Sequence, residues 1–192
     1  MVFAKNPVKG KVKTRLAHSI GHEHALDVYN LLLTHTLNVS KAVSAETIVF
    51  FSDSISHNLP AFPKHLTLAL QSGNDLGEKM CNAFQQSFAN GYGPVAIIGT
   101  DCFELTPEIV DKAFALLRQH EVVIGPAIDG GYYLLGMQRL VPELFTNKHW
   151  STASVFEDTI RDLEQLHISY ALLRELSDID NVEDLNKSAI KH

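Results

Sequence analysis

Cysteine is scarce in this sequence, and long apolar runs are missing from it. The two cysteines, Cys81 and Cys102, lie among apolar neighbours and show no C-x-x-C or zinc-type spacing. This scarcity excludes a disulfide scaffold and makes a reducing cytoplasm the expected location. The start, Met1-Val2-Phe3-Ala4-Lys5, is too short for a secretory signal, and no apolar run approaches the roughly 18 residues of a membrane span. We therefore expect a cytoplasmic protein with no membrane partner.

Basic residues are in the minority, and their placement is uneven. The 192 residues include 16 Lys+Arg and 22 Asp+Glu, for a formal net charge of −6. Such a protein has no general attraction to nucleic acid or to anionic membranes. The first 15 residues nevertheless carry +5 and no acid, so the remaining 177 carry −11. A short basic segment on an acidic body suits a small anion better than a long polyanion.

The apolar pattern predicts the fold class. With 45% hydrophobic and 20% charged residues, and with no repeat or Pro/Gly-rich linker, the chain is expected to form one domain over residues 1–192. Short apolar runs predict strands at Val2–Ala4, Thr47–Phe51, Leu66–Leu70, Val95–Gly99, Val122–Pro126, Tyr132–Gly136 and Ile168–Leu173. Helical patterns alternate with them at His22–Val43, Leu76–Phe88, Pro107–Gln119, Ser154–Leu166 and Val182–Ile190. This alternation predicts a three-layer α/β/α sandwich around a mostly parallel sheet.

Two details refine this prediction. The Gly130-Gly131 pair between two apolar runs indicates a turn, which would allow an antiparallel strand. The first expected strand has only three or four residues, whereas a central strand usually has about five or six. We therefore expect a few residues to be missing from the start of the chain.

The basic segment Lys5-Asn6-Pro7-Val8-Lys9-Gly10-Lys11-Val12-Lys13-Thr14-Arg15 directly follows the first expected strand. Ligands of open α/β sheets gather at the carboxyl ends of the strands, where this segment begins. A glycine lets backbone N–H groups approach an anion, and Lys and Arg neutralise phosphate oxygens. The segment is neither a Walker A loop nor a G-x-G-x-x-G motif. On composition alone, an anion-binding loop and a solvated basic turn are equally well supported.

Acidic residues follow two later segments. Asp101 ends the buried apolar run Val95–Thr100, a position suited to Mg²⁺, which takes few protein ligands and completes its shell with water and phosphate. A turn or helix-capping aspartate is the equally weighted alternative. Asp178 and Asp180 could supply a further metal ligand, but their spacing favours the start of the last helix at Asp180 and Asn181.

Two glycine-containing segments are compatible with a ligand site. Gly73 and Asp75 stand at a strand-to-helix junction, where they could line a nucleotide base or form the turn. The stretch Asp129-Gly130-Gly131 could allow close approach of a substrate, although Asp-Gly-Gly is also a common turn sequence. The ten histidines do not predict a metal site, because H-E-x-x-H is absent and His22 and His24 fall on different sides of a helix. No G-x-S-x-G elbow supports a serine hydrolase.

Taken in order, these segments resemble the bacterial DUF2064 or glycosyltransferase A-like family. That family is related to 2-phospho-lactate guanylyltransferase and, more distantly, to molybdenum-cofactor guanylyltransferases. The matching stretches span nearly the whole chain: Phe3-Ala4-Lys5-Asn6-Pro7 with Gly10, Lys13-Thr14-Arg15-Leu16, Gln71, Gly73, Asp75-Leu76-Gly77 with Met80, Ile98-Gly99-Thr100-Asp101, Gly125-Pro126-Ala127, Asp129-Gly130-Gly131-Tyr132-Tyr133, Trp150-Ser151-Thr152, Asp178-Ile179-Asp180 and Glu183-Asp184-Leu185. One departure is Phe103, which follows Cys102 where the family commonly has proline.

The resemblance implies the nucleotide-diphospho-sugar transferase fold, which is GT-A-like and Rossmann-like, and a site for Mg²⁺ or Mn²⁺. Lys13 and Arg15 would act on the phosphates, with Lys5, Pro7, Gly10 and Thr14 completing the loop around them. Asp101 would hold the metal, with Asp178 or Asp180 as the second acid and Thr100 beside the substrate. Gly73 and Asp75 would approach the base or ribose, and Asp129, Gly130 and Gly131 would shape the acceptor side.

The expected function is metal-dependent transfer of a nucleotide from a nucleoside triphosphate to a small phosphorylated acceptor. Sugar transfer from a nucleotide sugar is the alternative enzyme activity, but that class usually carries Asp-x-Asp, and Thr100-Asp101-Cys102 offers one acid. A nucleotide-binding protein without catalytic activity is the third interpretation. The sequence leaves the base, the acceptor and the oligomeric state open, a homodimer included.

Overall fold

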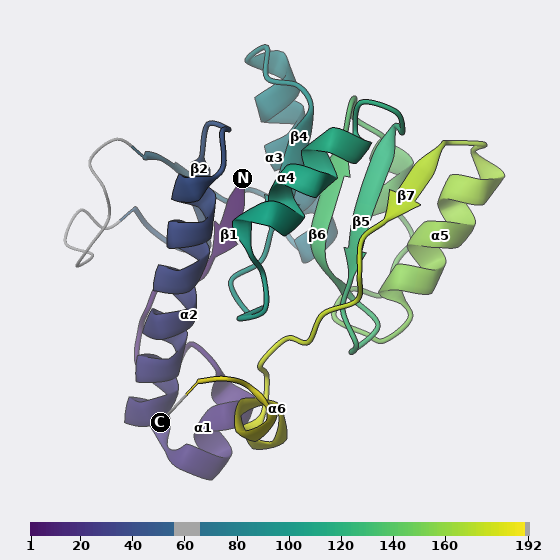
Figure 1. Cartoon of the computed structure of the whole chain (residues 1–192). Coiled ribbons are helices and arrows are strands. Elements are labelled where there is room, and N and C mark those ends of the chain that lie inside the picture. Colours follow the sequence, from purple (N-terminus) through teal and green to yellow (C-terminus); the bar gives the residue numbers. More distant parts are fainter. Residues whose placement is uncertain (56–65, 191–192) are drawn as a thin grey trace.

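The structure is a computed structural model and describes residues 1–55 and 66–190. Seven strands form one sheet in the order β3-β2-β1-β4-β6-β5-β7 (Figure 1). Their bounds are β1 Val2–Ala4, β2 Ile48–Phe51, β3 Thr67–Leu70, β4 Val95–Ile98, β5 Val122–Pro126, β6 Tyr132–Met137 and β7 Tyr170–Leu172. All neighbouring pairs are parallel except those of β6, which runs antiparallel to both β4 and β5. The mostly parallel sheet and the turn at Gly130-Gly131 are therefore confirmed.

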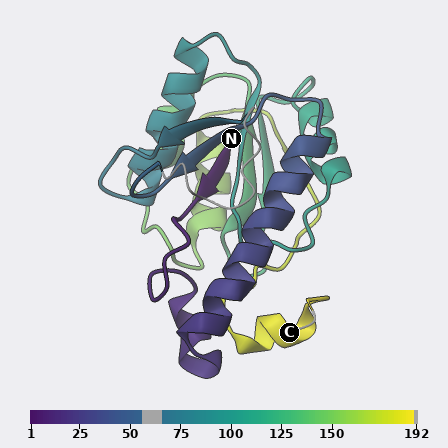
Figure 2. The same ribbon diagram turned by 90° about the vertical axis from the view of Figure 1, so that its left-hand side faces the viewer.

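Helices cover both faces of the sheet and form the three layers that the sequence predicts. On one face lie α2 (His22–Ala42) and α4 (Pro107–Leu116). On the other face lie α3 (Leu76–Ala89), the 3-10 helix η1 (Pro142–Phe145) and α5 (Val155–Gln165), so α2 and α3 flank the strands in Figure 2. Strands β4 and β5 are buried at every position, which explains their consecutive apolar residues. Within the described ranges, no helix is both long and apolar enough to cross a membrane.

Two further helices lie together beyond the carboxyl edge of the sheet, as Figures 1 and 2 both show. They are α1 (Thr14–Ile20) and α6 (Val182–Lys187), and they pack with α2 around the buried side chains Leu16, Leu32 and Leu185. Burial of each such leucine stabilises the fold by roughly 1.5–3 kcal/mol. The sequence prediction missed α1, because the basic residues at its start look like a loop and its apolar face is short. It also missed η1.

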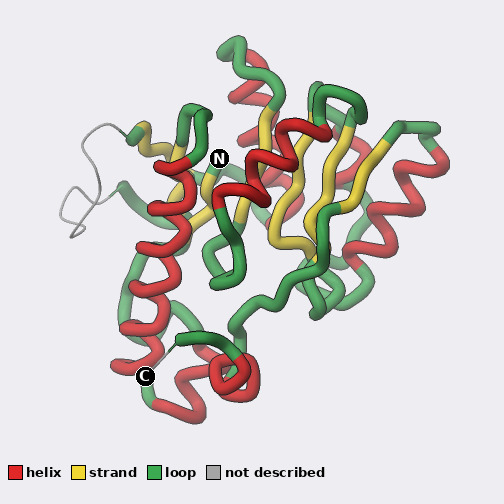
Figure 3. Tube along the Cα trace, in the orientation of Figure 1, coloured by secondary structure: helices red, strands yellow, loops and turns green. Residues whose placement is uncertain are grey.

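A single stretch of chain crosses the carboxyl edge from β7 to α6. Residues 174–181, here called the crossing segment, appear in Figure 3 as the loop that leaves β7 and passes the end of β5. Backbone N–H groups tie it down: Leu176 donates to the Pro126 carbonyl (3.1 Å), and Ile179 donates to the Asp101 carbonyl (2.9 Å). The crossing segment therefore carries acidic residues from the far edge of the sheet back to the end of β4.

Candidate functional site

The basic segment forms the loop between β1 and α1. Its beginning is held by α2, because the Tyr29 hydroxyl accepts from the Lys5 N–H (2.8 Å) and donates to the Lys5 carbonyl (2.7 Å). Gly10 has a left-handed backbone (φ 79°) and an open surface around it. Lys13 occupies the N-cap of α1, also in the left-handed region (φ 46°, ψ 45°). That conformation costs a residue with a side chain on the order of 1 kcal/mol, so the surroundings must hold Lys13 in place.

The ammonium group of Lys13 lies between two carboxylates. Its Nζ is 2.5 Å from Asp101 Oδ1 and 3.1 Å from Asp180 Oδ1. The Lys13 side chain is only 5% exposed, whereas those of Asp101 and Asp180 are 43% and 38% exposed. Burial by itself would lower the pKa of Lys13, but the charges of both aspartates outweigh it and hold that pKa above its usual value. Arg15 reaches the same acid, with its Nη1 3.7 Å from Asp180 Oδ2, and stays 75% exposed.

Hydrogen bonds hold the main chain in place at both aspartates. Asp101 follows β4 and the buried Thr100, and its carbonyl accepts from the crossing segment. Asp180 precedes α6, whose first turn is closed by a capping box between Asn181 and Asp184. The Asp184 carboxylate also accepts from the Asp180 N–H (3.0 Å). The sequence interpretation of this segment as a helix start is thus confirmed, with Asn181 as the capping residue and Asp180 just before it.

A third acid, Asp178, lies in the crossing segment beside this ion pair. It is half-buried, and its Oδ1 is shut off from solvent with no hydrogen-bond partner among residues 1–55 and 66–190. Burial, together with the negative charges of Asp101 and Asp129, raises the pKa of Asp178 to about 7. The site therefore holds more carboxylates than Lys13 and Arg15 neutralise.

The turn from β5 to β6 borders the same edge. Asp129 closes it by accepting the Gly131 N–H on Oδ1 (2.9 Å). Gly130 has φ 88°, and a Cβ there would overlap the Ala153 carbonyl, so this position requires glycine on both counts. The turn is thus locked against the loop that precedes α5, while the exposed Asp129 side chain remains at the edge.

The junction between β3 and α3 lies on the far side of β1 and β2 from Asp101. Asp75 is the N-cap of α3, and its Oδ1 accepts from the Glu78 N–H (2.8 Å). Gly73 has φ 138°, and a Cβ there would overlap Glu78. The structure therefore brings Lys13, Arg15, Asp101 and Asp180 into direct contact and keeps the Asp178 and Asp129 charges close to them, whereas none of the contacts described for Gly73 and Asp75 reaches these residues.

Three polar side chains that support this edge were not foreseen as functional. Tyr29 holds the start of the basic loop, and burial raises its pKa to about 12. The buried Asn6 accepts from the Ser54 N–H (3.3 Å) and donates to the Ser54 carbonyl (2.8 Å), which joins the loops after β1 and β2. Gln71 donates to the carbonyls of Ala4 (3.2 Å) and Phe50 (3.0 Å). The signal for Asn6 and Gln71 was a polar amide at a strand end, whereas Tyr29 looks like any apolar-face residue of its helix.

Mg²⁺ and Mn²⁺ can be tested against these acids. Asp101 Oδ1 and Asp180 Oδ1 face one point, since both contact the same nitrogen atom, and the buried Oδ1 of Asp178 lacks a partner in the described part of the chain. Mg²⁺ is commonly held by one or two carboxylates with substrate phosphates and water completing its shell. No group of three or more Asp, Glu, His or Cys within the described residues forms a complete protein cage for a metal. The residues thus fit a two-carboxylate site that shares its ion with a phosphate ligand.

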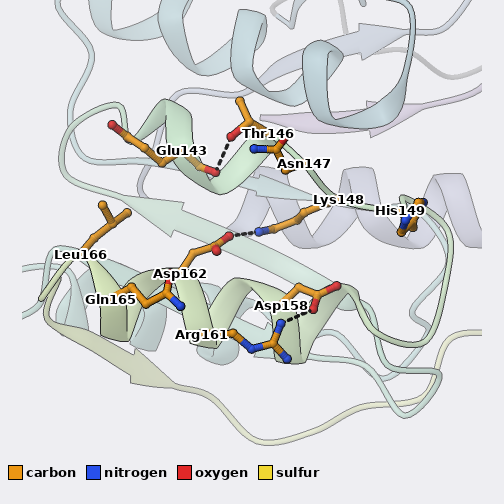
Figure 4. Close-up of a pocket in the computed structure, with 10 residues that line it drawn as sticks. All are labelled: Glu143, Thr146, Asn147, Lys148, His149, Asp158, Arg161, Asp162, Gln165 and Leu166. Carbon is orange, nitrogen blue, oxygen red and sulfur yellow. Dashed lines mark hydrogen bonds and ion pairs between the residues drawn. The ribbon is translucent and has the colours of Figure 1, made fainter.

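A separate pocket of about 460 Å³ lies between η1, the loop after it and α5 (Figure 4). Lys148 in this pocket is 1% exposed and pairs with Asp162, and Arg161 pairs with Asp158 at 2.9 Å. None of the predicted site residues lines it. Its two cations are each matched by one acid, so the pocket holds no unpaired cation among its described lining residues.

Comparison with known proteins identifies relatives of the chain. Residues 36–152 match the family described as "Uncharacterized protein conserved in bacteria (DUF2064)". No curated protein matches the sequence. Among solved structures, a proposed nucleotide-diphospho-sugar transferase from Desulfovibrio desulfuricans G20 is 33% identical, with a TM-score of 0.90, over 96% of this chain and 83% of that one.

More distant structures share the fold. CMP:2-keto-3-deoxy-manno-octonic acid synthetase in complex with CTP is 10% identical, with a TM-score of 0.56, over 97% of this chain and 94% of that one. Rv0371c from Mycobacterium tuberculosis H37Rv in complex with manganese is 11% identical, with a TM-score of 0.53, over 81% and 84% of the two chains. At this identity the likeness concerns the fold alone. The sequence match and the 33% identical relative go further: this chain belongs to the DUF2064 family, on a nucleotide-diphospho-sugar transferase fold.

Proposed function

We propose that this protein is a metal-dependent nucleotidyltransferase that moves a nucleotide from a nucleoside triphosphate to a small phosphorylated acceptor. One observation carries the proposal: the buried ammonium of Lys13 lies between Asp101 and Asp180 at the carboxyl edge of the sheet. This arrangement supplies a cation for phosphates and two carboxylates for a divalent ion at the same point. Both are needed when phosphate charge must be neutralised in the transition state.

The basic loop would bind the triphosphate. Lys13 and the exposed Arg15 would contact the β- and γ-phosphates, with Lys5, Pro7 and Thr14 around them. The open surface at Gly10 leaves room for phosphate oxygens to approach the backbone. The loop would thus neutralise the pyrophosphate as it leaves.

Asp101 and Asp180 would hold Mg²⁺ or Mn²⁺, and Asp178 would add negative charge behind them. A bound ion would neutralise phosphate charge and withdraw electron density from the phosphorus atom. The backbone contacts of Asp101 to the crossing segment, and of Asp180 to α6, would keep the two carboxylates in position during the reaction.

In the reaction, an oxygen of the acceptor phosphate would attack the α-phosphorus in line. A new phosphorus–oxygen bond forms there while the bond from the α-phosphorus to the bridging oxygen breaks, and pyrophosphate leaves with that electron pair. Little covalent chemistry is required of the protein, because positioning and charge neutralisation supply most of the acceleration. Thr100 would lie beside the reacting group, and Gly73 and Asp75 would border the base or ribose. Asp129, Gly130 and Gly131 would shape the acceptor side.

Sugar transfer from a nucleotide sugar is the second candidate function. The 33% identical relative, a proposed nucleotide-diphospho-sugar transferase, favours it. Against it, Thr100-Asp101-Cys102 supplies one acid directly after β4, where sugar transferases of this fold usually carry two.

The complex of a distant relative with CTP makes CTP the first triphosphate to test.

A thermal-shift panel would test the proposal. It should contain the common triphosphates, nucleotide sugars and pyrophosphate, each with and without Mg²⁺ or Mn²⁺. A ligand at 100 times its Kd stabilises the folded state by about 2.7 kcal/mol. We expect metal-dependent stabilisation by one triphosphate, and pyrophosphate release once the acceptor is supplied. Selective stabilisation by a nucleotide sugar would favour sugar transfer. No shift with any nucleotide would contradict both enzyme activities and the nucleotide-binding interpretation.

A further inference from the structure

We propose that Lys13 holds the place of the divalent cation in the nucleotide-free protein, so that metal binding requires a phosphate ligand to draw Lys13 away. This inference rests on the proposed function, because the ligand that moves Lys13 is the triphosphate. It makes nucleotide and metal binding cooperative through one side chain.

The geometry around Lys13 is that of a filled cation site. Its Nζ contacts carboxylate oxygens from two separate loops, one after β4 and one before α6. The side chain is almost fully buried although both aspartates are more than one-third exposed. The acids are therefore open to solvent on the side away from Lys13, and the lysine fills the space between them.

A second cation could not join Lys13 at this point. A metal ion bound to the same two oxygens would lie within a few ångströms of the ammonium, inside a partly buried site where charge repulsion is poorly screened. The buried Oδ1 of Asp178 lacks a hydrogen-bond partner among the described residues, but its presence does not remove the repulsion between two cations. Metal and Lys13 therefore compete for Asp101 and Asp180.

The structure also provides a way to release Lys13. Arg15 is three-quarters exposed and lies one residue into α1, so it can contact an incoming phosphate before Lys13 moves. A lysine stem is flexible and can turn its ammonium from the carboxylates to a neighbouring phosphate. Asp101 and Asp180 would then be free to hold the metal. Because coupling between two ligands is reciprocal, the metal would tighten nucleotide binding by the same factor.

A purely structural ion pair makes the opposite prediction for a variant without the charge. If Lys13 only stabilises the fold, its removal lowers stability and leaves metal affinity unchanged or weaker. If Lys13 occupies the cation site, its removal makes the site bind metal more tightly. The sign of the change in metal affinity therefore separates the two interpretations.

The test is a titration of the full chain with Mn²⁺ in the absence of nucleotide. Calorimetry and the electron paramagnetic resonance signal of free Mn²⁺ both measure the binding. We expect Lys13→Gln to bind Mn²⁺ roughly 5- to 150-fold more tightly than the unmodified protein, the usual range of such coupling. Lys13→Arg keeps the charge and should bind Mn²⁺ as the unmodified protein does. Lys9→Gln removes the same charge from the same loop, where Lys9 pairs with Glu23, and serves as the matched control.

Equal or weaker Mn²⁺ binding by Lys13→Gln would overturn the inference. If Lys13→Gln does not fold, Lys13→Gly takes its place, because glycine suits the left-handed backbone at φ 46°. Nucleotide binding is measured in parallel. If no triphosphate binds the unmodified protein while Lys13→Gln still gains Mn²⁺ affinity, the competition stands and the proposed function fails. If a triphosphate binds but Mn²⁺ affinity does not change, the proposed function stands and the competition is refuted.

Discussion

Two regions of this molecule bury a lysine beside aspartates, and they differ in what surrounds the pair. In the pocket between η1 and α5, Lys148 meets Asp162, and Arg161 meets Asp158, so each cation has one acid. At the carboxyl edge, Lys13 is shared between Asp101 and Asp180, and the neighbouring Asp178 has a buried oxygen without a partner in the described residues. A one-to-one ion pair is typical of a structural role, whereas a lysine shared between two carboxylates, beside a third with a buried unpartnered oxygen, can give way to a divalent ion. The presence of a pocket between η1 and α5 therefore does not by itself identify the functional site.

The largest difference between the two regions should come from removing one acid in each. Asp101→Asn should reduce turnover by at least about 100-fold, comparable to the loss of one transition-state contact, because the metal loses a ligand. Asp162→Asn in the pocket should leave turnover unchanged. Steady-state pyrophosphate release measures both, with the exposed Asp111→Asn as a further control. Unchanged turnover and nucleotide binding in Asp101→Asn would contradict the assigned metal role.

Replacing the pocket lysine should affect stability and leave ligand binding intact. Lys148→Met removes a buried charge and leaves Asp162, which is 31% exposed, without its partner. We expect a loss of about 1–3 kcal/mol in the free energy of unfolding, measured by denaturant titration. Triphosphate affinity should match that of the unmodified protein. If Lys148→Met bound the triphosphate more weakly at unchanged stability, the pocket would have a binding role, and the contrast between the two regions would be wrong.

Asp178 should make stability depend on pH. The unfolded carboxyl titrates near 3.9, and the folded one at about 7, so the folded state binds more protons between these values. Its contribution is fully present below pH 4 and is lost as the pH rises through 7. Asp178→Asn should therefore be more stable than the unmodified protein at pH 8 by about 1–3 kcal/mol.

This advantage of Asp178→Asn should shrink at pH 5, which thermal unfolding at the two pH values can measure. Asp53→Asn, in a loop outside the charge cluster, is the matched substitution and should show no such pH-dependent gain. An equal gain for Asp178→Asn at both pH values would contradict the raised pKa of Asp178 in the folded protein.

The smallest effect should follow loss of the exposed cation. Arg15→Ala should weaken triphosphate binding about 3- to 10-fold, since a solvent-exposed charge contact contributes about 1 kcal/mol. The deficit should shrink at high salt, because screening weakens the contact in the unmodified protein. Binding titrations at two salt concentrations test this, with the exposed Lys11→Ala as control. An undiminished affinity would remove Arg15 from the phosphate loop.

Most of the fold could be predicted from the sequence, because its strands and long helices have strong apolar patterns. Val2–Ala4 and Val122–Pro126 were predicted with the bounds that the structure shows, and the other strands differ by one or two residues at their ends. Helix α1 escaped prediction because Leu16 and Ala17 form an apolar face only when α2 and α6 cover them. The sequence around Leu16 and Ala17 does not show that α2 and α6 pack against them.

The residues of the candidate site could be predicted from the sequence, but the contacts between them could not. Lys13 and Asp180 are 167 positions apart, and no local pattern shows that the crossing segment returns Asp180 to β4. The burial of the Asp178 oxygen could not be predicted either, because the spacing of Asp178 and Asp180 suits the start of a helix equally well. The functional roles of these residues remain predictions for the experiments above.

Strand β6 has a geometric consequence for whatever binds at this edge. By inserting between β4 and β5, it places the end of β5 one strand further from Asp101 than it would be if β5 paired with β4 directly. One strand spacing is about 4.8 Å. The antiparallel strand thus works as a spacer that separates the Asp101 loop from the end of β5, and the turn at Asp129 joins this spacer to β5.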